Sequence, residues 1–344
     1  VPVAAVDHLT AAACFPTIQN AGFYGNLAVS GFDGKVNTFS AGAYGAAARV
    51  PHFFVPWVLK QFGQKVGWKF QGTFLQDPDA QRLVLANLFS LDAAGTITVK
   101  NHLPDMTAGG LLIELRKLFN LFLDFDVRRK ICEISFVDDI LKSQPLIDWT
   151  AKAALDWNKI PEVVNRLELA YDIDGNDALL KPIPAHMDKY VTPETPANEG
   201  GSTLPVRSRF STYLTDAGTG LAVTSQAGIS PNNKDSQQQG TPKLLFWNGL
   251  VGGLPTATAK TATSSLYFQG ANSLPARYWK QFERFKGNTF LLRTSLALSP
   301  ADLATFSFKN KVHIRGVNYL VGALKASLKG DQQAVPVEVE LWRV

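Results

Sequence analysis

Residues 105–141 constrain the fold most, because their hydrophobic period changes halfway along the stretch. Thr107 is a suitable N-cap. Apolar residues then follow at the spacing of a helix with one buried stripe, namely Leu111, Leu112, Leu115, Leu118 and Phe119. Glu114 and Lys117 lie on or near the opposite, solvent-facing side of this predicted helix. The first half of the stretch therefore predicts one amphipathic helix.

The second half of the stretch has the period of β-strands. From Leu123 to Val127 apolar residues alternate with aspartates, and a basic turn, Arg128–Lys130, follows. A second extended run, Ile131–Phe136, carries Cys132, which we expect to be a buried structural residue. Together the two halves predict a helix that packs on a small antiparallel sheet.

A similar order of elements occurs earlier in the chain. An amphipathic helix is predicted from the stripe of Val55, Val58, Leu59, Phe62 and Val66. Pro56 is tolerated only in the first turn of such a helix, and Gly67 is a suitable C-terminal cap. Trp68 and Phe70 then alternate as in a strand. A helix followed by a strand is thus expected twice, near 55–75 and 107–127, and an internal duplication stays open.

The rest of the chain reads mainly as β-structure. Asp33–Gly34 predicts a hairpin within the N-terminal 1–47 segment, and Ile97 with Val99 predicts a short strand. Further strands are expected at 147–150, 165–173, 242–249, 289–298, 312–324 and 335–344, with a helix at 274–285. In the last strand, Pro336 indicates a sheet edge or the start of the pairing.

These segments predict an α+β fold that is predominantly β, built of small β-barrel or β-sheet domains with helix-on-sheet modules. We divide the chain into an N-terminal β segment (1–47), two helix-on-sheet modules (48–144), a β segment with long polar loops (145–240) and a C-terminal β domain (241–344). The loops at 186–203 and 215–242 are rich in Gly, Pro, Ser, Asn and Gln, so we expect them at the surface or against a neighbour.

Composition excludes several classes of protein. No apolar run reaches the roughly 18 residues of a membrane span, and two cysteines cannot build a disulfide framework. The net charge of +5 is unevenly distributed, because 101–200 carries 11 basic against 17 acidic residues and 271–344 carries 11 against 5. Since no basic cluster is interleaved with exposed aromatics, nucleic acid is not the expected partner. The opposite signs suit contacts between copies of the chain.

No motif predicts a reaction centre. The five histidines lack the spacing of a metal site, and the glycine-rich pieces match neither a dinucleotide fingerprint nor a phosphate loop. Asp124, Asp126, Asp138 and Asp139 are the densest carboxylates, but no opposing acid completes a glycosidase pair. We therefore assign no catalytic, cofactor-binding or metal-binding residue, expect no cofactor, and expect the chain not to be an enzyme.

Three pieces of the chain resemble a known family. Residues 101–140, the strand Leu244–Gly249 and the terminal strands within 311–328 and 335–344 are similar to structural proteins of bacteriophage tails, the baseplate or tail hub type related to late control protein D. The resemblance implies a virion protein of the tail, assembled in the host cytoplasm. It also implies a homo-oligomeric ring, often a trimer, that connects the tail tube to the spike or other baseplate proteins at the tail tip. It transfers no functional residues.

Two alternatives stay open at this stage. A tail protein that binds a receptor or carbohydrate would use aromatic residues, such as Trp247, Trp279 and Trp342, although these fall mostly in stripes typical of a core. A cell-wall hydrolase carried on the tail would depend on carboxylates such as Asp124 and Asp138. A glycan array and peptidoglycan zymography would distinguish these from a hub protein.

Overall fold

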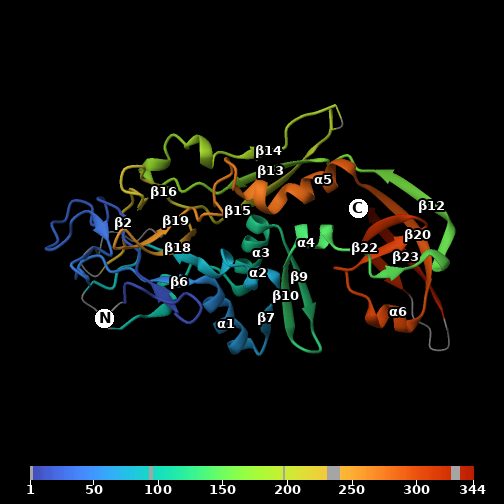
Figure 1. Ribbon diagram of the computed structural model, residues 1–344, viewed down its shortest axis with the longest axis horizontal. Coiled ribbons are helices and arrows are strands. Elements are labelled where there is room, and N and C mark those ends of the chain that lie inside the picture. The colour runs from blue at the N-terminus through green and yellow to red at the C-terminus, as the bar shows by residue number, and fades with distance from the viewer. Residues whose placement is uncertain (1–2, 93–95, 197, 231–240, 327–333) are drawn as a thin grey trace.

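The computed structural model describes residues 3–92, 96–196, 198–230, 241–326 and 334–344. Within them the fold is mixed α and β and predominantly β, as the sequence predicts. Figure 1 shows two parts along the long axis of the molecule. One part contains several small sheets and most of the helices, and the other contains a single six-stranded half-barrel, the longest-stranded sheet of the described chain.

A five-stranded antiparallel sheet lies at the centre of the first part, in the order β1-β6-β8-β18-β19. Its strands are β1 (Ala13–Cys14), β6 (His52–Phe54), β8 (Leu83–Ala86), β18 (Lys243–Val251) and β19 (Leu254–Thr258). The predicted strand at 242–249 is thus confirmed and extends further. Strands from 1–47, 48–144 and 241–344 share this sheet, so these segments are interleaved in space.

Both predicted helix-and-strand units are present and share one three-stranded sheet, β7-β10-β9. The first unit is α1 (Val55–Val66) with β7 (Lys69–Gln71), and the second is α3 (Ala108–Phe119) with β9 (Leu121–Asp126) and β10 (Ile131–Phe136). Each helix ends in a left-handed residue, Gly67 or Asn120, which turns the chain directly into the strand. The two units therefore have the same local construction, in which a helix ends at a left-handed residue and leads directly into a strand.

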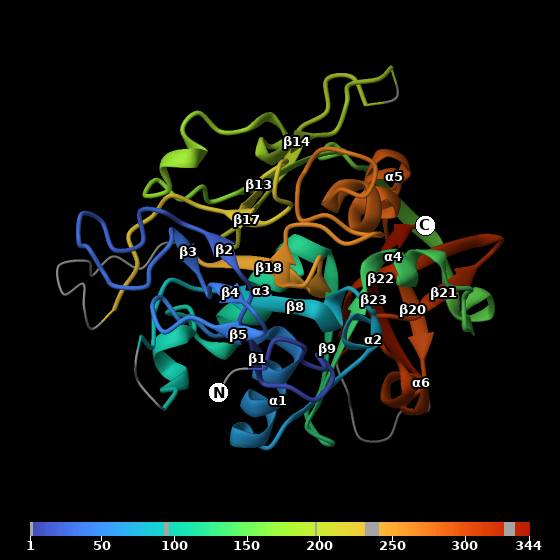
Figure 2. The ribbon, with the colours of Figure 1, turned by 60° about the vertical axis from the view of Figure 1, so that its left-hand side comes forward.

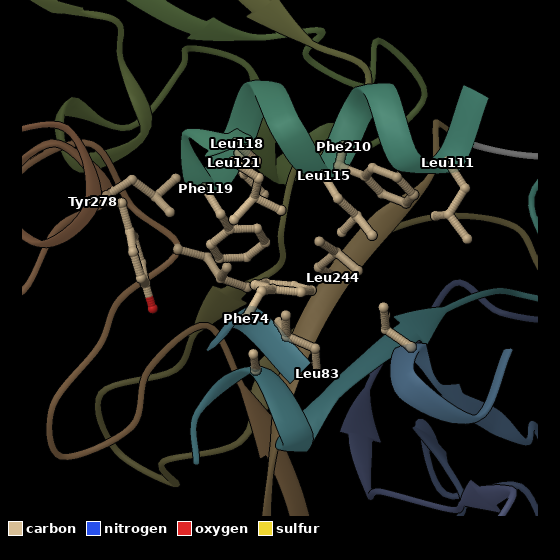
Figure 3. Close-up of a cluster of buried hydrophobic side chains, with 14 of the residues drawn as sticks. Phe74, Leu83, Leu111, Leu115, Leu118, Phe119, Leu121, Phe210, Leu244 and Tyr278 are labelled. Atoms are coloured by element: carbon tan, nitrogen blue, oxygen red, sulfur yellow. The ribbon is translucent and has the colours of Figure 1, made fainter. Parts of the chain in front are cut away.

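The helix α3 covers the largest core of the described chain. Thr107 caps it by accepting the backbone N–H of Gly110 at 3.0 Å, as predicted. Its apolar stripe is buried, and Figure 3 shows Leu115 and Leu118 of this stripe near Phe74, Leu83 and Leu244 of the elements below. The same core includes the buried Cys132, also as predicted.

The position predicted for Glu114 is wrong. This side chain is buried, because its carboxylate accepts the backbone N–H of Arg209 at 2.8 Å and lies 2.8 Å from Nζ of Lys117. The strand β15 (Thr203–Ser208), which precedes Arg209, packs across α3 and covers the side that local periodicity assigns to solvent. Segments distant in the sequence thus decide which helix face is open.

Two other local predictions are also wrong. Residues 26–33 form no strand; β3 (Lys35–Val36) pairs with β2 (Ile18–Gln19) instead, and the local hairpin joins β4 (Phe39–Ser40) to β5 (Ala43–Tyr44). No strand forms at Ile97 and Val99. Val99 instead begins a 3-10 turn, η2 (Val99–His102). Gly42, at a φ of 80°, supplies the turn that Asp33–Gly34 suggested.

Short helical pieces connect the strands of this part. They are α2 (Thr73–Gln76), η1 (Ala80–Arg82), α4 (Val137–Lys142), η4 (Ala178–Leu180) and η5 (Ala185–Met187). The predicted helix at 274–285 is confirmed as η6 (Pro275–Trp279), a π-type turn, continued by α5 (Lys280–Asn288). The indole N–H of Trp279 donates to the carbonyl of Leu118 at 3.1 Å and so anchors this helix on α3.

In their described residues, the expected surface loops hold two short strands, β14 (Tyr190–Val191) and β17 (Ala222–Val223), and two more strands, β15 and β16 (Leu214–Thr215), overlap their boundaries. The strand predicted at 165–173 is β13 (Arg166–Tyr171), which lies between β14 and β15. Farther along, β16 and β17 join β2 and β3 in a four-stranded sheet. Residues 197 and 231–240 of these loops lie outside the described residues.

The second part is the half-barrel, in the order β11-β21-β22-β23-β20-β12. Its strands are β11 (Ile147–Asp148), β12 (Ala153–Pro161), β20 (Phe290–Leu298), β21 (Lys311–Ile314), β22 (Val317–Ala326) and β23 (Val335–Arg343), with η3 (Thr150–Lys152) and α6 (Pro300–Thr305) as connections. Figure 2 shows it on the side of the molecule away from β2 and β3. Since β23 pairs on both sides, Pro336 marks the start of the pairing and not an edge.

Candidate functional site

The half-barrel is strongly curved, and its connections show why. β11 and β12 are its two edge strands, yet only five residue steps separate Asp148 from Ala153. Six strands laid flat would separate the edges by about 24 Å. Five extended residues span at most about 17 Å. The sheet must therefore curl until its edges approach each other.

Trp149 fills the interior that this curvature creates. Its indole is 1% exposed and stands between the two edge strands in the sequence. It packs against Phe306 at a ring distance of 5.5 Å and against the inward-facing residues of the central strands, among them Leu296, Val312, Val337 and Leu341. The strand alternation predicted for 335–344 supplies three of the eleven buried residues of this core, Val337, Val339 and Leu341. The half-barrel thus has a hydrophobic core of its own.

The outer edge of β12 is open. Within the described chain, β12 ends its sheet, with β20 on one side and no strand on the other. Five successive residues, 155–159, are exposed, and two of them are large and apolar, Leu155 (85% exposed) and Trp157 (57%). Isolated exposed apolar residues are ordinary, but two within three residues of an edge strand are unusual.

The open edge is held rigidly from its inner side. The pairing with β20 shifts between Ala153 and Trp157, so that residues 154–156 bulge from the sheet. The hydroxyl of Thr294 donates to the carbonyl of Asp156 at 2.9 Å, and Arg315 donates to the carbonyl of Ala153 at 2.9 Å. Lys152 pairs with Asp302 at 2.6 Å, which helps to hold the pKa of that carboxyl down to about 2. A bulge held in this way aims Leu155 outward.

An open strand edge offers a row of backbone donors and acceptors to another strand. Proteins use such edges to add a strand from a partner, and exposed apolar side chains then give the pairing its affinity. This edge has no acid–base or metal-binding chemistry. Asp156 and Lys159 are its only charged residues, and Lys159 lies over the ring of Phe290 at 4.2 Å.

The opposite charges of 101–200 and 271–344 have partners within the chain. Lys309 pairs with Glu133 at 2.7 Å, Lys286 pairs with Glu162, and Lys152 pairs with Asp302. These ion pairs link the acidic region to the basic region of the same molecule. These three pairs therefore stabilise the fold of one molecule.

The acidic cluster noted in the sequence is dispersed. Asp124 accepts the hydroxyl of Ser307 at 3.1 Å, whereas Asp126 binds Arg129 at 2.6 Å, and the N–H groups of Arg129 hold the pKa of Asp126 low. Asp138 is buried and accepts the backbone N–H groups of Gln281 and Phe282, while its burial raises its pKa. Asp124 and Asp138 thus connect segments distant in the sequence, whereas Asp126 stabilises its own turn.

The aromatic and histidine side chains mostly belong to the interior. Trp247 and Trp279 are buried, and Trp342 lies partly exposed beneath the ammonium group of Lys286 at 5.7 Å. His52 and His102 are buried, and burial lowers the pKa of each to about 4. Among the described residues, no group of three or more His, Cys, Asp or Glu side chains is placed to hold a metal ion.

A cavity of about 380 Å³ lies where β8, β18 and the segment before β16 meet. Asn87, Asp172, Arg209 and Lys243 are among its lining residues. The ammonium group of Lys243 donates to the carboxylate of Asp174, and it donates to Oε1 of Gln226 at 3.1 Å. It is therefore already paired with groups in the wall of the cavity. The cavity has both polar and apolar lining residues, and they bring no nucleophile and base together.

No strand was predicted at 153–161, so the exposed Leu155 and Trp157 were not among the predicted functional residues. Their alternation with Asp156 and Asn158 is the pattern that predicts a strand, and it was available in the sequence. The sequence does not show that this strand has an unpaired edge, because that depends on which strands pair elsewhere in the fold.

Comparison with known proteins finds no matching family model and no curated protein with significant similarity. None of the helices in the described residues is long and apolar enough to cross a membrane.

Proposed function

We propose that this chain is a structural component of a bacteriophage tail or baseplate, a hub protein that forms a ring between the tail tube and the tip or spike. The proposal rests on the resemblance of residues 101–140, 244–249 and the terminal strands to tail hub proteins. The proposal that copies of the chain assemble rests on one structural observation, the open edge of β12 with its exposed Leu155 and Trp157.

The partner at this edge is a second copy of the chain. The two edges of the half-barrel differ, since β12 has nine residues and β11 only two, with exposed Leu146 beside it. Contacts between unlike surfaces repeat from copy to copy and close into a ring when the rotation allows. A neighbouring strand on β12 would cover Leu155 and Trp157 and satisfy the free backbone groups of the edge.

Mass photometry across a dilution series tests the assembly. The full chain is expected to form trimers or larger closed rings, and Leu155→Lys or Trp157→Lys should raise the dissociation constant at least tenfold. Val251→Lys is the matched control, because Val251 is also an exposed apolar residue of a strand but lies in β18. A chain that stays monomeric at every concentration would contradict the proposal, as would a simple dimer.

The position in the virion needs a separate experiment. Immunogold electron microscopy of phage tails with an antibody against the chain should place the label at the tail tip. Label along the tail tube, on the head, or nowhere on intact particles would refute the hub assignment even if the rings form.

A further inference from the structure

The turn of the β9–β10 hairpin lies beside the end of α1, far from β12. Both views of the molecule show the hairpin turn projecting next to this helix end (Figures 1 and 2). The backbone N–H of Lys69 donates to the carbonyl of Lys130 at 2.9 Å, and Trp68 packs edge-on against Phe125 with ring centres 5.8 Å apart. We call this surface the hairpin-tip patch, formed by Lys65, Val66, Trp68, Lys69, Phe125, Val127, Arg128, Arg129 and Lys130.

The patch exposes apolar side chains that the core does not use. Phe125 follows Leu121 and Leu123 at alternate positions of β9, but unlike the buried Leu121 it is 50% exposed. Val127 at the turn is 72% exposed, and Val66 on the last turn of α1 is also exposed. Apolar side chains from two separate segments thus gather at one end of the module, and such a cluster usually marks a binding surface.

Cationic residues neighbour these apolar residues in the sequence of both segments. Lys65, Lys69, Arg128 and Lys130 are exposed, and no carboxylate of the described residues lies within ion-pair distance of them. Arg129 alone is paired, with Asp126. Arg128, Arg129 and Lys130 lie within 101–200, the region with a net negative charge, whereas Lys65 and Lys69 come from α1 and β7. The positive charge is therefore local, and contacts inside the fold do not account for it.

From this combination we propose that the hairpin-tip patch binds the anionic headgroup surface of a lipid bilayer. Valine and phenylalanine at the turn enter the boundary between headgroups and acyl chains, and Trp68 lies at the depth that indole rings favour. The lysines and arginines extend their charged ends to the lipid phosphates. Because the patch projects as a turn, a deformable lipid surface fits it better than a rigid protein groove.

A polyanion such as nucleic acid fits the cations but not the valines. Val66 and Val127 have no hydrogen-bonding groups and no ring to stack on a base, so they contribute little to such a complex. At a bilayer the same side chains leave water on binding. The apolar part of the patch therefore favours lipid, and an experiment that separates charge from apolar area distinguishes the two.

Sedimentation of the full chain with sucrose-loaded vesicles tests the proposal. Vesicles of phosphatidylcholine and phosphatidylglycerol at 3:1 should bind the protein at least tenfold more strongly than phosphatidylcholine alone. Arg128→Gln and Val127→Ser should each weaken binding at least threefold, and the double variant at least tenfold. The control V251S/K280Q removes an exposed valine and an exposed lysine elsewhere and should bind like the wild type.

Insertion has a second readout in tryptophan fluorescence. Vesicles with brominated acyl chains should quench part of the emission, and Trp68→Phe should remove that part. Three results would overturn the proposal: no binding of the wild type to anionic vesicles, equal losses in the tip and control variants, or a loss with Arg128→Gln but none with Val127→Ser. The last result would show a general polyanion site.

Discussion

Lys243 and Asp174 form an ion pair in which both side chains are almost completely buried, 2% and 1% exposed. Lys243 is on β18, the strand next to β8 in the central sheet, and Asp174 is in the turn after β13. Gln226 donates to the same carboxylate oxygen at 2.7 Å, and the ammonium group lies 5.4 Å from the ring centre of Tyr213. The pair thus joins the central sheet to the middle segment.

Breaking this pair should destabilise the protein strongly. Lys243→Met leaves Asp174 buried without its counter-charge, which typically costs about 3–5 kcal/mol of unfolding free energy. The double variant K243M/D174N should recover much of that loss, because no uncompensated charge remains. Urea unfolding measures both. Lys325→Met at the exposed pair with Glu338 is the control and should cost under about 1 kcal/mol. Equal effects at the two sites would contradict the buried pairing.

The two faces of α3 should respond very differently to a charge. Leu115→Asp or Phe119→Asp places a carboxylate in the core. Because burying an unpaired charge costs several kcal/mol of unfolding free energy, either change should abolish folding. Ile113→Asp on the same helix is the matched control, because Ile113 is 50% exposed. Circular dichroism and thermal unfolding should show a folded I113D and an unfolded L115D. A folded, monodisperse L115D would mean that Leu115 is not in the core.

Glu114 should contribute to stability although it lies on the predicted solvent face. Glu114→Ala leaves the backbone N–H of Arg209 without its acceptor and should lower the unfolding free energy by about 1–3 kcal/mol. Lys117→Ala removes only the partly exposed partner of the same carboxylate and should cost under about 1 kcal/mol. Chemical denaturation of the two variants in parallel measures the difference. If K117A were the more damaging change, the backbone contact would not be the stabilising one.

Stability should fall as the solution becomes mildly acidic, because of two buried histidines. His52 and His102 have a pKa of about 4 in the folded chain, below the value of about 6.5 in an unfolded chain. Their contribution is complete above pH 6.5 and is lost between pH 6.5 and 4, where the unfolded chain binds protons that the folded chain does not. The expected slope approaches about 1.4 kcal/mol per pH unit for each histidine.

Urea unfolding at pH 7.5, 6.0 and 5.0 measures this slope. His102→Phe, which keeps an aromatic ring beside Phe89, should reduce the slope by about half relative to the wild type. A wild-type unfolding free energy that does not change over this range would show that these histidines are accessible to protons in the folded state.

Helices and strands with a strong local period were predictable from the sequence. The stripe of α3, its cap at Thr107, the end of α1 at Gly67 and the alternation of β23 all depend on residues close together in the chain. A helix repeats its side-chain directions every 3.6 residues and a strand every two residues. The spacing of the apolar residues therefore identifies the element without knowledge of the rest of the fold.

The candidate site was less predictable. The period of β12 is present in the sequence, but its open edge depends on β20 and β23 pairing with each other and on the short link that curls the sheet around Trp149. The hairpin-tip patch arises in the same way, because β7 pairs beside β10 and brings Lys69 to Lys130. No local pattern contains these neighbours.

By itself the sequence determined the α+β character of the chain, the existence of its two helix-and-strand units and its final strand. Only the tertiary structure decided that Glu114 is buried, that β18 lies beside β8, that the opposite charges pair within one molecule and that Leu155 and Trp157 are exposed. The physical reason is the range of the interactions: helix and strand formation is set by near neighbours, whereas burial and strand partnership depend on which distant segments pack together.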